Sequence, residues 1–544
     1  MPNQIEEWKR EKAPLDVLPD IHRYAQLGFA AITKDDKARF RWYGIYSQVP
    51  NDGNFMLRIK IPGGALSQAQ VLAIAALAEE YAHGFADITT RQDIQLHWLT
   101  IEQMPDVFAR LRQVGLTTTE ACGDCVRNVI GCPVAGLDAQ EAVDAHALVR
   151  EVTEHFVGNP EFENLPRKFK IGITGCRENC IQAEMQDVGL TPAQRDGEWG
   201  FNLRVGGGLS TQPMFARAID VFVGRDEVLP MLRGVVGIFR DDGYRDRRNR
   251  ARLKFLVADW GEARFRAELE ARVGRPLRSA GSEDRHWVGD HHMGIHPQKQ
   301  PGFSYAGLVV PAGRISAAQL AGVARLSAAY GQGEVRLTGS QNLIIPWLPN
   351  ARLSDLLSEP LLQELQPAPP AFSRRLVTCT GEQFCNFGQI ETKERARRLA
   401  AYLDEQFPGL EEPIRIHLTG CPNACAQWQV GDIALLGVRA RIDNEIVPAI
   451  DIAVGGGFGP TPTFATLLRR RVPDTEAGPA LARLVRGWLQ HRQPGESFRD
   501  YVHREEPARL VAWVGGADPG STFGIGDAPQ GRLATEAPAA GGEE

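Results

Sequence analysis

The sequence has no apolar run long enough to span a membrane, and its first residues, MPNQIEEWKREKAPLD, lack the apolar core of a signal peptide. It also has no excess of basic residues, because 61 Lys and Arg stand against 67 Asp and Glu, giving a net charge of −6. This balance argues against a nucleic-acid-binding protein. No G-x-G-x-x-G motif stands between an expected strand and an expected helix, so a nicotinamide or flavin site of the chain's own is not expected. We therefore expect a cytoplasmic protein.

The nine cysteines are odd in number and tightly clustered, which does not fit a disulfide framework in a chain without a secretion signal. In the C-terminal half they form a Cys-x5-Cys and a Cys-x3-Cys pair, made by Cys379, Cys385, Cys421 and Cys425. Four thiolates suit either a [4Fe–4S] cluster or a tetrahedral zinc ion. Zinc sites favour Cys-x2-Cys spacing, which neither pair has, so the cluster is the better interpretation.

The chain contains an internal repeat. The segment from Pro62 to Trp98 can be laid without a gap on the segment from Pro311 to Trp347, and RVGGGLS (204–210) matches AVGGGFG (453–459). Each copy begins as strand, turn, amphipathic helix and strand, which is half of a ferredoxin-like unit. The sequence thus predicts an α+β fold that is internally duplicated. It should have ferredoxin-like halves and two mixed α/β cofactor domains related by pseudo-twofold symmetry.

This pattern predicts a division of the chain into seven parts. They are an N-terminal extension (1–41), a ferredoxin-like half (42–118), a cofactor domain with basic residues for the substrate (119–277), a linker (278–302), a second ferredoxin-like half (303–355), a second cofactor domain (356–514) and a disordered tail (515–544).

The first copy repeats part of the cysteine pattern. IGITGCRENCIQAEMQD (171–187) matches IHLTGCPNACAQWQVGD (416–432), so Cys176 and Cys180 correspond to Cys421 and Cys425. If Cys122 is aligned with Cys379, Asn128 takes the place of Cys385. One thiolate of four is then lost. Three cysteines could hold a labile cluster, but the loss of one thiolate favours a structural remnant in the first copy. This alignment therefore predicts a cluster in the second copy only.

Several further segments carry a family resemblance. They are MLRIKIPGG (56–64), TTRQDIQLHW (89–98), VRNVIGCPVAG (126–136) and NLPRKFKIGITG (164–175). Together with the cysteine signature, they resemble the assimilatory sulfite and nitrite reductases that carry siroheme coupled to a [4Fe–4S] cluster. The resemblance covers the chain from about residue 40 to residue 460.

The resemblance implies a role for individual residues. The four cysteines of the second copy would bind the cluster, with Cys425 bridging to the siroheme iron. The TRQ segment would contact the siroheme through Arg91, Gln95 and His97. The substrate anion would meet Arg58, Arg127, Lys168 and Lys170 at the open face of the iron. These residue types suit the chemistry, because siroheme carries many carboxylates and each oxygen lost from the substrate needs cations and proton donors nearby.

Sulfite and nitrite are both consistent with the resemblance. A lysine at position 170 resembles the sulfite-reducing members, whereas the nitrite enzymes of plants and cyanobacteria tend to have asparagine at this position. VRNVIGCPVAG is more similar to the nitrite branch. WYGIYSQ (42–48) and TTTEACGDC (117–125) resemble a bacterial sulfite reductase group in which a tyrosine and a cysteine are joined, here Tyr46 and Cys122. A core tyrosine and a leftover cysteine is the alternative. The balance favours sulfite.

The electron donor should be a separate small protein. The family's usual donor for single chains of this length is reduced ferredoxin, with an NADPH-dependent flavoprotein as the alternative. Ferredoxins are acidic, and the densest basic run, RDRRNRARLK (245–254), is a candidate docking segment or a solvated helix face. Two other functions stay open at this point, precorrin-3B synthase and a non-catalytic electron carrier or zinc-stabilised scaffold. A monomer is expected.

Overall fold

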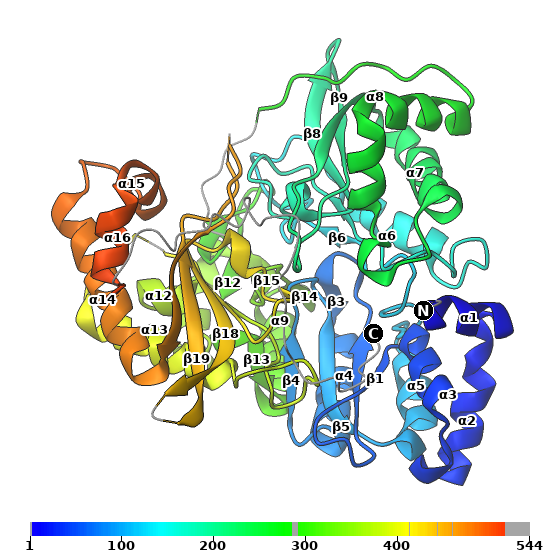
Figure 1. Ribbon diagram of the computed structural model, residues 1–544, viewed down its shortest axis with the longest axis horizontal. Coiled ribbons are helices and arrows are strands. Elements are labelled where there is room, and N and C mark those ends of the chain that lie inside the picture. The colour runs from blue at the N-terminus through cyan, green and yellow to red at the C-terminus, as the bar shows by residue number, and fades with distance from the viewer. Residues whose placement is uncertain (1–2, 285–291, 413, 443, 460, 517–544) are drawn as a thin grey trace.

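The computed structural model describes residues 3–284, 292–412, 414–442, 444–459 and 461–516. All but the first two residues of the predicted tail, 515–544, lie outside this part of the chain. Within it, the strands form four five-stranded sheets. Figure 1 shows two sheets at the centre of the molecule, with a cofactor domain beyond each of them. Among the described helices, none is both long enough and apolar enough to cross a membrane.

The two central sheets belong to the ferredoxin-like halves. The first contains β1 (Ile45–Ser47), β2 (Phe55–Ile59), β4 (Phe85–Ile88) and β5 (Ile94–Leu99), covered by α4 (Gln68–Tyr81) and α5 (Met104–Gln113). The second contains β11 (Gly294–Pro297), β12 (Phe303–Leu308), β14 (Glu334–Leu337) and β15 (Leu343–Pro349), with α9 (Ala317–Tyr330), α10 (Leu353–Leu357) and α11 (Leu361–Glu364).

Each half lends one strand to the other. Strand β3 (Ala65–Ser67) leaves the first half and pairs antiparallel with β14, while β13 (Arg314–Ser316) leaves the second half and pairs with β4. Helix α4 packs against α9 across the same boundary. One hydrophobic core accordingly runs through both halves, from Ile59 and Leu77 to Val323 and Ile345. The ferredoxin-like halves form a single interlocked unit.

Local backbone features confirm the repeat. Ser67 and Ser316 precede α4 and α9 and form the same capping box. The serine hydroxyl accepts from the backbone N–H of the glutamine three residues later, and that glutamine side chain accepts from the backbone N–H of the serine. Trp98 and Trp347, matched in the two copies, both adopt a positive φ, 71° and 64°. Such a conformation is uncommon for a bulky residue, so finding it twice shows that the two copies share one backbone path.

The cofactor domains also share a topology. The first contains β6 (Ile130–Gly131), β7 (Ile171–Ile173), β8 (Val188–Arg195), β9 (Glu198–Val205) and β10 (Arg217–Val223) with α6 (His146–Phe156), α7 (Val228–Asp242) and α8 (Leu253–Val273). The second contains β16 (Leu376–Thr378), β17 (Ile416–Thr419), β18 (Ile433–Ile442), β19 (Glu445–Val454) and β20 (Thr466–Pro473) with α12 (Ala371–Arg374), α13 (Lys393–Gln406), α14 (Asp474–His491), α15 (Phe498–Arg504) and α16 (Pro507–Trp513). In both, the first three strands are parallel and the rest antiparallel.

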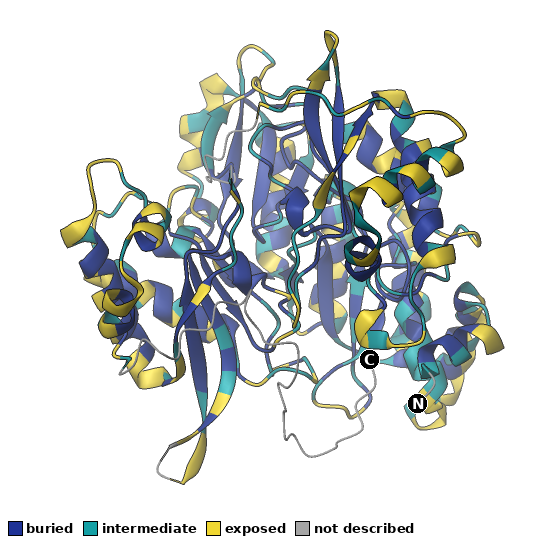
Figure 2. Ribbon diagram, turned by 45° about the horizontal axis from the view of Figure 1, so that its top comes forward, coloured by how far each residue is buried: buried dark blue, intermediate teal, exposed yellow. Residues whose placement is uncertain are grey.

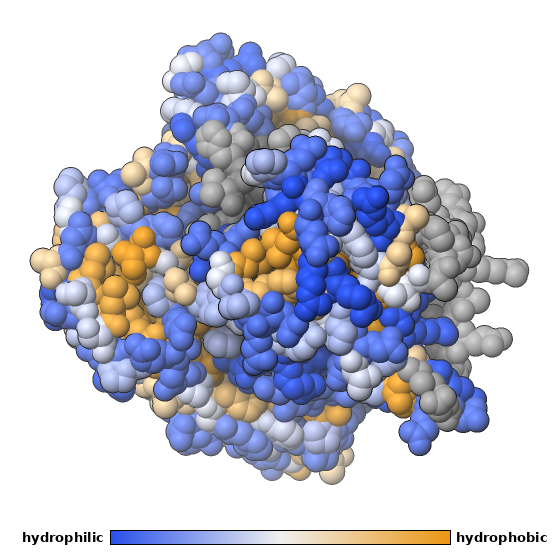
Figure 3. Space-filling model, turned by 90° about the vertical axis from the view of Figure 1, so that its left-hand side faces the viewer, coloured by the Kyte–Doolittle hydropathy of each residue, from blue (hydrophilic) through white to orange (hydrophobic). Residues whose placement is uncertain are grey.

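Helices cover the outer side of each cofactor domain and leave the loops at the strand ends facing inward. Figure 2 shows exposed residues along the outer helices and buried ones along the sheets. The outer face of the second cofactor domain, turned to the viewer in Figure 3, is mainly hydrophilic, with apolar residues in separate areas. Each domain has a hydrophobic core of its own, around Phe239 in the first and Trp488 in the second.

The chain ends differ from the simple plan. Residues 1–41 are not a bare extension, since α1 (Gln4–Glu11), α2 (Leu18–Leu27) and α3 (Lys34–Arg39) fold onto the first half and bury Ile21. The prediction of a linker over 278–302 is wrong at residues 294–297, because β11 forms there and pairs with β12. The alternation of apolar and polar residues is too weak over those four residues to indicate a strand.

Because of the exchanged strands, the two halves should not fold apart. Expressed alone, residues 1–290 and 291–544 should each aggregate or melt without cooperativity, since each keeps a sheet edge and an apolar helix face without its partner. Co-expressed with a tag on one fragment only, both should be recovered together in one complex. Size-exclusion chromatography and calorimetry measure this. Two separately soluble fragments with sharp melting transitions would contradict it.

Candidate functional site

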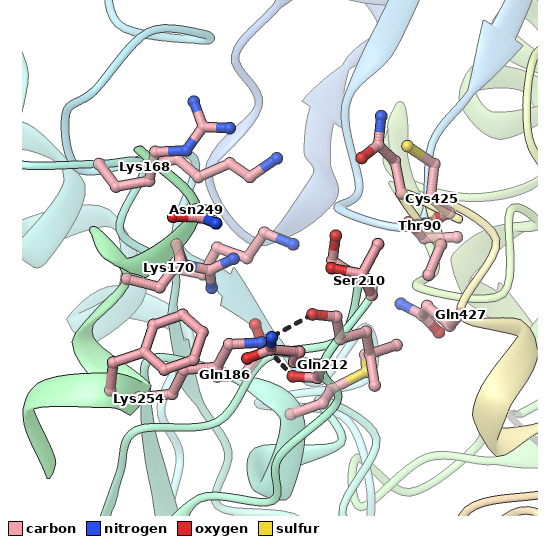
Figure 4. Close-up of a pocket in the computed structure, with 18 of the residues that line it drawn as sticks. Thr90, Lys168, Lys170, Gln186, Ser210, Gln212, Asn249, Lys254, Cys425 and Gln427 are labelled. Atoms are coloured by element: carbon pink, nitrogen blue, oxygen red, sulfur yellow. Dashed lines mark hydrogen bonds between the residues drawn. The ribbon is translucent and has the colours of Figure 1, made fainter. Parts of the chain in front are cut away.

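A cavity of about 360 Å³ lies between the first cofactor domain and the cysteine loop of the second. Its walls are formed by the TRQ segment after β4, the residues that lead into β7, the glycine-rich loop after β9 and the residues at the start of α8. Opposite them stands the loop that carries Cys425. Figure 4 shows Lys168, Lys170 and Lys254 on one wall and Thr90, Cys425 and Gln427 on the other.

The cavity is strongly cationic. Among its lining residues are seven Lys and Arg side chains and no Asp or Glu, namely Arg91, Arg167, Lys168, Lys170, Arg248, Arg252 and Lys254. So many cations converging on one hollow raise the local concentration of anions and bind them directly. The donor set therefore fits a ligand with several carboxylates, and a small oxyanion beside it.

The glycine-rich loop needs its glycines to reach the cavity. Gly206 has a φ of +83°, and a Cβ on Gly207 would lie 2.4 Å from the carbonyl oxygen of Glu184. The loop is thus pressed against the segment that follows the Cys-x3-Cys of its own half. Leu209, Ser210, Thr211 and Gln212 line the cavity as a result.

Lys170 can face the cavity because another residue neutralises the carboxylate beneath it. Asp187 is fully buried, accepts the backbone N–H of Lys170 at 2.9 Å and is paired by the guanidinium of Arg252 at 2.8 to 3.2 Å. In the second copy, the matching Asp432 is paired by Arg415 itself, at 2.6 and 3.0 Å. Arg252 thereby takes the role that Arg415 fills in the other copy.

The crowding of cations lowers their pKa values. Burial lowers the pKa of Lys170 well below its usual range, and the positive charges of Arg91 and Arg252 act in the same direction. Burial likewise lowers the pKa of Lys254 to about 7, assisted by Arg252. Burial also lowers the pKa of Arg91 to about 10. Such lysines accept a proton when an anion arrives and can return it during reaction.

Four of the predicted catalytic residues meet behind the cavity. Arg58 donates to the sulfur of Cys122 at 3.1 Å, and Arg127 donates to the carbonyl of Gly123 at 2.8 Å in the same loop. Burial raises the pKa of Tyr46, and the thiolate charge of the neighbouring Cys122 adds to the effect. The structure thus brings together Tyr46, Cys122, Arg58 and Arg127. Lys168 lies both in the main cavity and in the smaller hollow beside Tyr46.

The second-copy cysteines lie on two loops that follow adjacent parallel strands. Cys379 comes directly after β16, and Cys421 comes two residues after β17. The backbone N–H of Gly420 donates to the Cys379 sulfur at 3.1 Å, as it would to a metal-bound thiolate. Cys425 is exposed at the edge of the cavity. Four thiols with this backbone support fit the cluster, and Cys425 is placed to reach a group in the cavity.

Gln95 and His97 lie elsewhere. Neither lines the main cavity. The ring of His97 stacks on Phe384 with centroids 4.1 Å apart and contacts Asp87 and Gln48, while Gln95 lies 3.4 Å from the Thr380 hydroxyl. Both side chains therefore support the loop between Cys379 and Cys385 from below. Of the three residues predicted to contact the siroheme, Arg91 lines the cavity.

The alignment of Cys122 with Cys379 is wrong. In the sheets, Gly131 pairs with Ile173 just as Thr378 pairs with Leu418, so the residue that matches Cys379 is Cys132. Asn128 does not replace Cys385 either, since its amide donates to the carbonyls of Ile61 and Arg91. The spacing in the sequence agrees with this correction, since Cys132 follows Trp98 by 34 residues and Cys379 follows Trp347 by 32, whereas Cys122 follows Trp98 by only 24.

Part of the basic run 245–254 turns inward, while its role in docking stays a prediction. Arg248 and Arg252 pair with Asp124 and Asp187, and Lys254 donates to the carbonyls of Gly208 and Leu209. These three side chains line the cavity and were missed as site residues. The density of charge was the available signal. A helix start that points inward could not be distinguished from a solvated face by charge alone.

A cationic cavity lies beside loops that carry four cysteines, and this combination defines a redox enzyme that acts on a small anion. Comparisons with known proteins agree with this class. The family model for the nitrite and sulphite reductase 4Fe-4S domain matches residues 122–277 and 371–517, and that for the nitrite/sulfite reductase ferredoxin-like half domain matches 48–114 and 296–362.

Relatives and a solved structure extend the likeness over nearly the whole chain. A ferredoxin–nitrite reductase of Synechococcus elongatus is 43% identical, covering 84% of this chain and 91% of its own. A sulfite reductase [ferredoxin] of Mycobacterium tuberculosis is 37% identical, covering 93% and 95%. The structure of M. tuberculosis NirA protein superposes with a TM-score of 0.89 at 36% identity, covering 94% and 98%.

The chain therefore belongs to the nitrite and sulphite reductase family. It is an oxidoreductase whose cofactors are siroheme and a [4Fe–4S] cluster, rather than a carrier or scaffold.

Binding of siroheme should draw a proton onto Lys254 above pH 7. In the cofactor-free chain a pKa of about 7 leaves Lys254 mostly charged at pH 6 and mostly neutral at pH 8. At pH 8 the wild type should take up about one more proton per chain on binding siroheme than Lys254→Arg, which is already charged. The difference should vanish at pH 6. Calorimetry in buffers of different ionisation enthalpy measures the uptake, and equal uptake by both proteins at pH 8 would contradict the prediction.

Proposed function

We propose that this chain catalyses the six-electron reduction of sulfite to sulfide, with reduced ferredoxin as electron donor. The observation that carries the proposal is Lys170, whose ammonium extends into the cavity because Arg252 neutralises Asp187. Sulfite is partly a dianion near neutral pH, so a further positive charge favours it over nitrite, which is a monoanion.

The cofactors would supply electrons singly to the bound anion, and the chain supplies everything else. Arg91 would hold siroheme carboxylates from the cavity wall. Lys168 and Lys170 would hold the oxyanion and return protons as its oxygens leave as water. Arg58 and Arg127 would fix the loop that carries Cys122 beside that position.

Ferredoxin as the donor is supported by the printed names of the relatives and by the lack of a nucleotide-binding motif in the sequence. The cluster loop offers an entry point, since Gln383 and Asn386, on either side of Cys385, are exposed. Electrons need only a short path through protein from such a surface to the four cysteines.

Replacement of Lys170 by asparagine should move the preference from sulfite toward nitrite. Loss of one positive charge weakens the hold on a dianion more than on a monoanion, so the ratio of kcat/KM for sulfite to that for nitrite should fall by about tenfold. The assay uses holoenzyme and reduced ferredoxin, with sulfide and ammonium quantified. The matched control is Lys299→Asn. It removes an exposed lysine that pairs with Glu141 and does not line the cavity.

Nitrite reduction by the same residues is the second candidate. The named nitrite reductases at 40% and 43% identity favour it, as does the segment VRNVIGCPVAG. A wild-type enzyme with a higher kcat/KM for nitrite than for sulfite would establish this alternative.

We further propose that Tyr46 and Cys122 become joined. Cys122 is buried and Tyr46 is half-buried, Arg58 donates to the Cys122 sulfur, and Arg41 lies over the Tyr46 ring at 5.5 Å. Joining the Cys122 sulfur to the ring removes two hydrogens and two electrons, which an oxidant such as dioxygen must accept. Intact mass spectrometry of the denatured chain should show the loss of two hydrogens, absent in Tyr46→Phe and Cys122→Ser. An unmodified wild-type mass would contradict the link.

A further inference from the structure

A second group of metal-ligating side chains lies in the first copy. Cys132, Cys176, Cys180 and His292 offer one ligand atom each, and all four atoms lie within 4.8 Å of one another. The sulfur of Cys180 is 3.6 Å from that of Cys176 and 3.7 Å from that of Cys132. Three of the four residues are buried and the fourth, Cys180, is partly so.

The two sulfur–sulfur distances match those around a single ion. With metal–sulfur bonds of about 2.3 Å, two thiolates at corners of a tetrahedron stand about 3.8 Å apart, and a thiolate and an imidazole nitrogen about 3.6 Å. The sulfur of Cys132 is 3.8 Å from Nε2 of His292, close to the second figure, whereas the sulfur of Cys180 lies nearer to the same nitrogen, at 3.0 Å. A four-iron cluster places irons and sulfides between its thiolates and needs a wider nest. Among the described residues, the second-copy cysteines are not drawn together in this way.

The first-copy group occupies the place that matches the cluster of the second copy. Cys132 follows β6 as Cys379 follows β16, and both copies keep the Cys-x3-Cys. By the repeat, the apolar Ile344 and Pro346 on β15 correspond to Gln95 and His97, and Ile344 packs against this group. The fourth ligand is contributed by the segment that enters the second half, in the form of His292.

The surroundings support a bound ion. His292 reaches the group through Nε2, while its Nδ1 lies 3.1 Å from the Tyr305 hydroxyl, which fixes the orientation of the ring. The backbone N–H of Glu178 lies 3.3 Å from the Cys176 sulfur as a donor. Met293 and Ile344 shield the group from solvent. Ligand orientation, backbone support and an apolar shell are the usual attributes of a structural metal site.

We propose that Cys132, Cys176, Cys180 and His292 bind one zinc ion. Three thiolates and one imidazole are a common structural zinc set with no open position for catalysis. Its cysteine pairs are separated by two to four residues, so Cys176-x3-Cys180 fits although Cys-x2-Cys is favoured. The ion joins the loops after β6 and β7 to the segment that leads into β11, which pairs with β12 of the second half. It would therefore fasten the two copies together where the chain crosses between them.

Metal analysis of the purified holoenzyme tests this. The expected content is about one zinc per chain in addition to about five irons, four from the cluster and one from siroheme. Cys176→Ser and His292→Ala should each lower the zinc content at least tenfold while the visible absorption bands of siroheme remain. The matched control is Cys125→Ser, which changes a buried cysteine outside the group and should keep its zinc.

X-ray absorption at the zinc edge of the wild-type enzyme keeps the proposal testable if a variant fails to fold. It should show about three sulfurs near 2.3 Å and one nitrogen near 2.0 Å. About nine irons per chain without zinc would replace the proposal by a second cluster. Five irons alone, with the three thiols reacting freely after denaturation, would show a hydrogen-bonded thiol group that binds no metal. Either result overturns the zinc site.

Discussion

The exchange of β3 and β13 is the constraint on which the rest of the molecule depends. Each ferredoxin-like sheet is completed by a strand from the other copy, so the two sheets have one fixed relation. The cofactor domains are attached to those sheets and inherit that relation. A cavity built from both domains can then keep its shape, because the hydrophobic core behind it runs through both halves.

The two copies have equivalent sites after their parallel strands, but different side chains pair with the same buried groups in each copy. The carboxylates of Asp187 and Asp432 have the same place and accept the same backbone N–H, yet one is neutralised by Arg252 and the other by Arg415. Because a buried carboxylate must be paired, the identity of that partner decides whether the neighbouring cation is used up or is directed into the cavity. Lys170 is available in the first copy for this reason.

The cysteines follow the same logic. The loops after the two parallel strands of each domain place thiols together in both copies. The second copy holds four cysteines in a wide nest supported by Gln95 and His97. In the first copy the ligand atoms of three cysteines and His292 lie close together, and apolar side chains pack against the cysteines. The first copy has no cysteine between Cys132 and Cys176 to match Cys385, and His292, from the segment that leads into the second half, completes its group instead.

The sequence by itself determined the duplication, the fold class and the second-copy cysteines, because spacing and apolar periodicity are local properties that repeat visibly along the chain. Arg91, Lys168 and Lys170 were also found, through motifs. Only the tertiary structure decided the strand exchange and the inward course of Arg248, Arg252 and Lys254. Each of these depends on pairing between segments distant in sequence, where the register is set by packing and buried charge rather than by the residues' order.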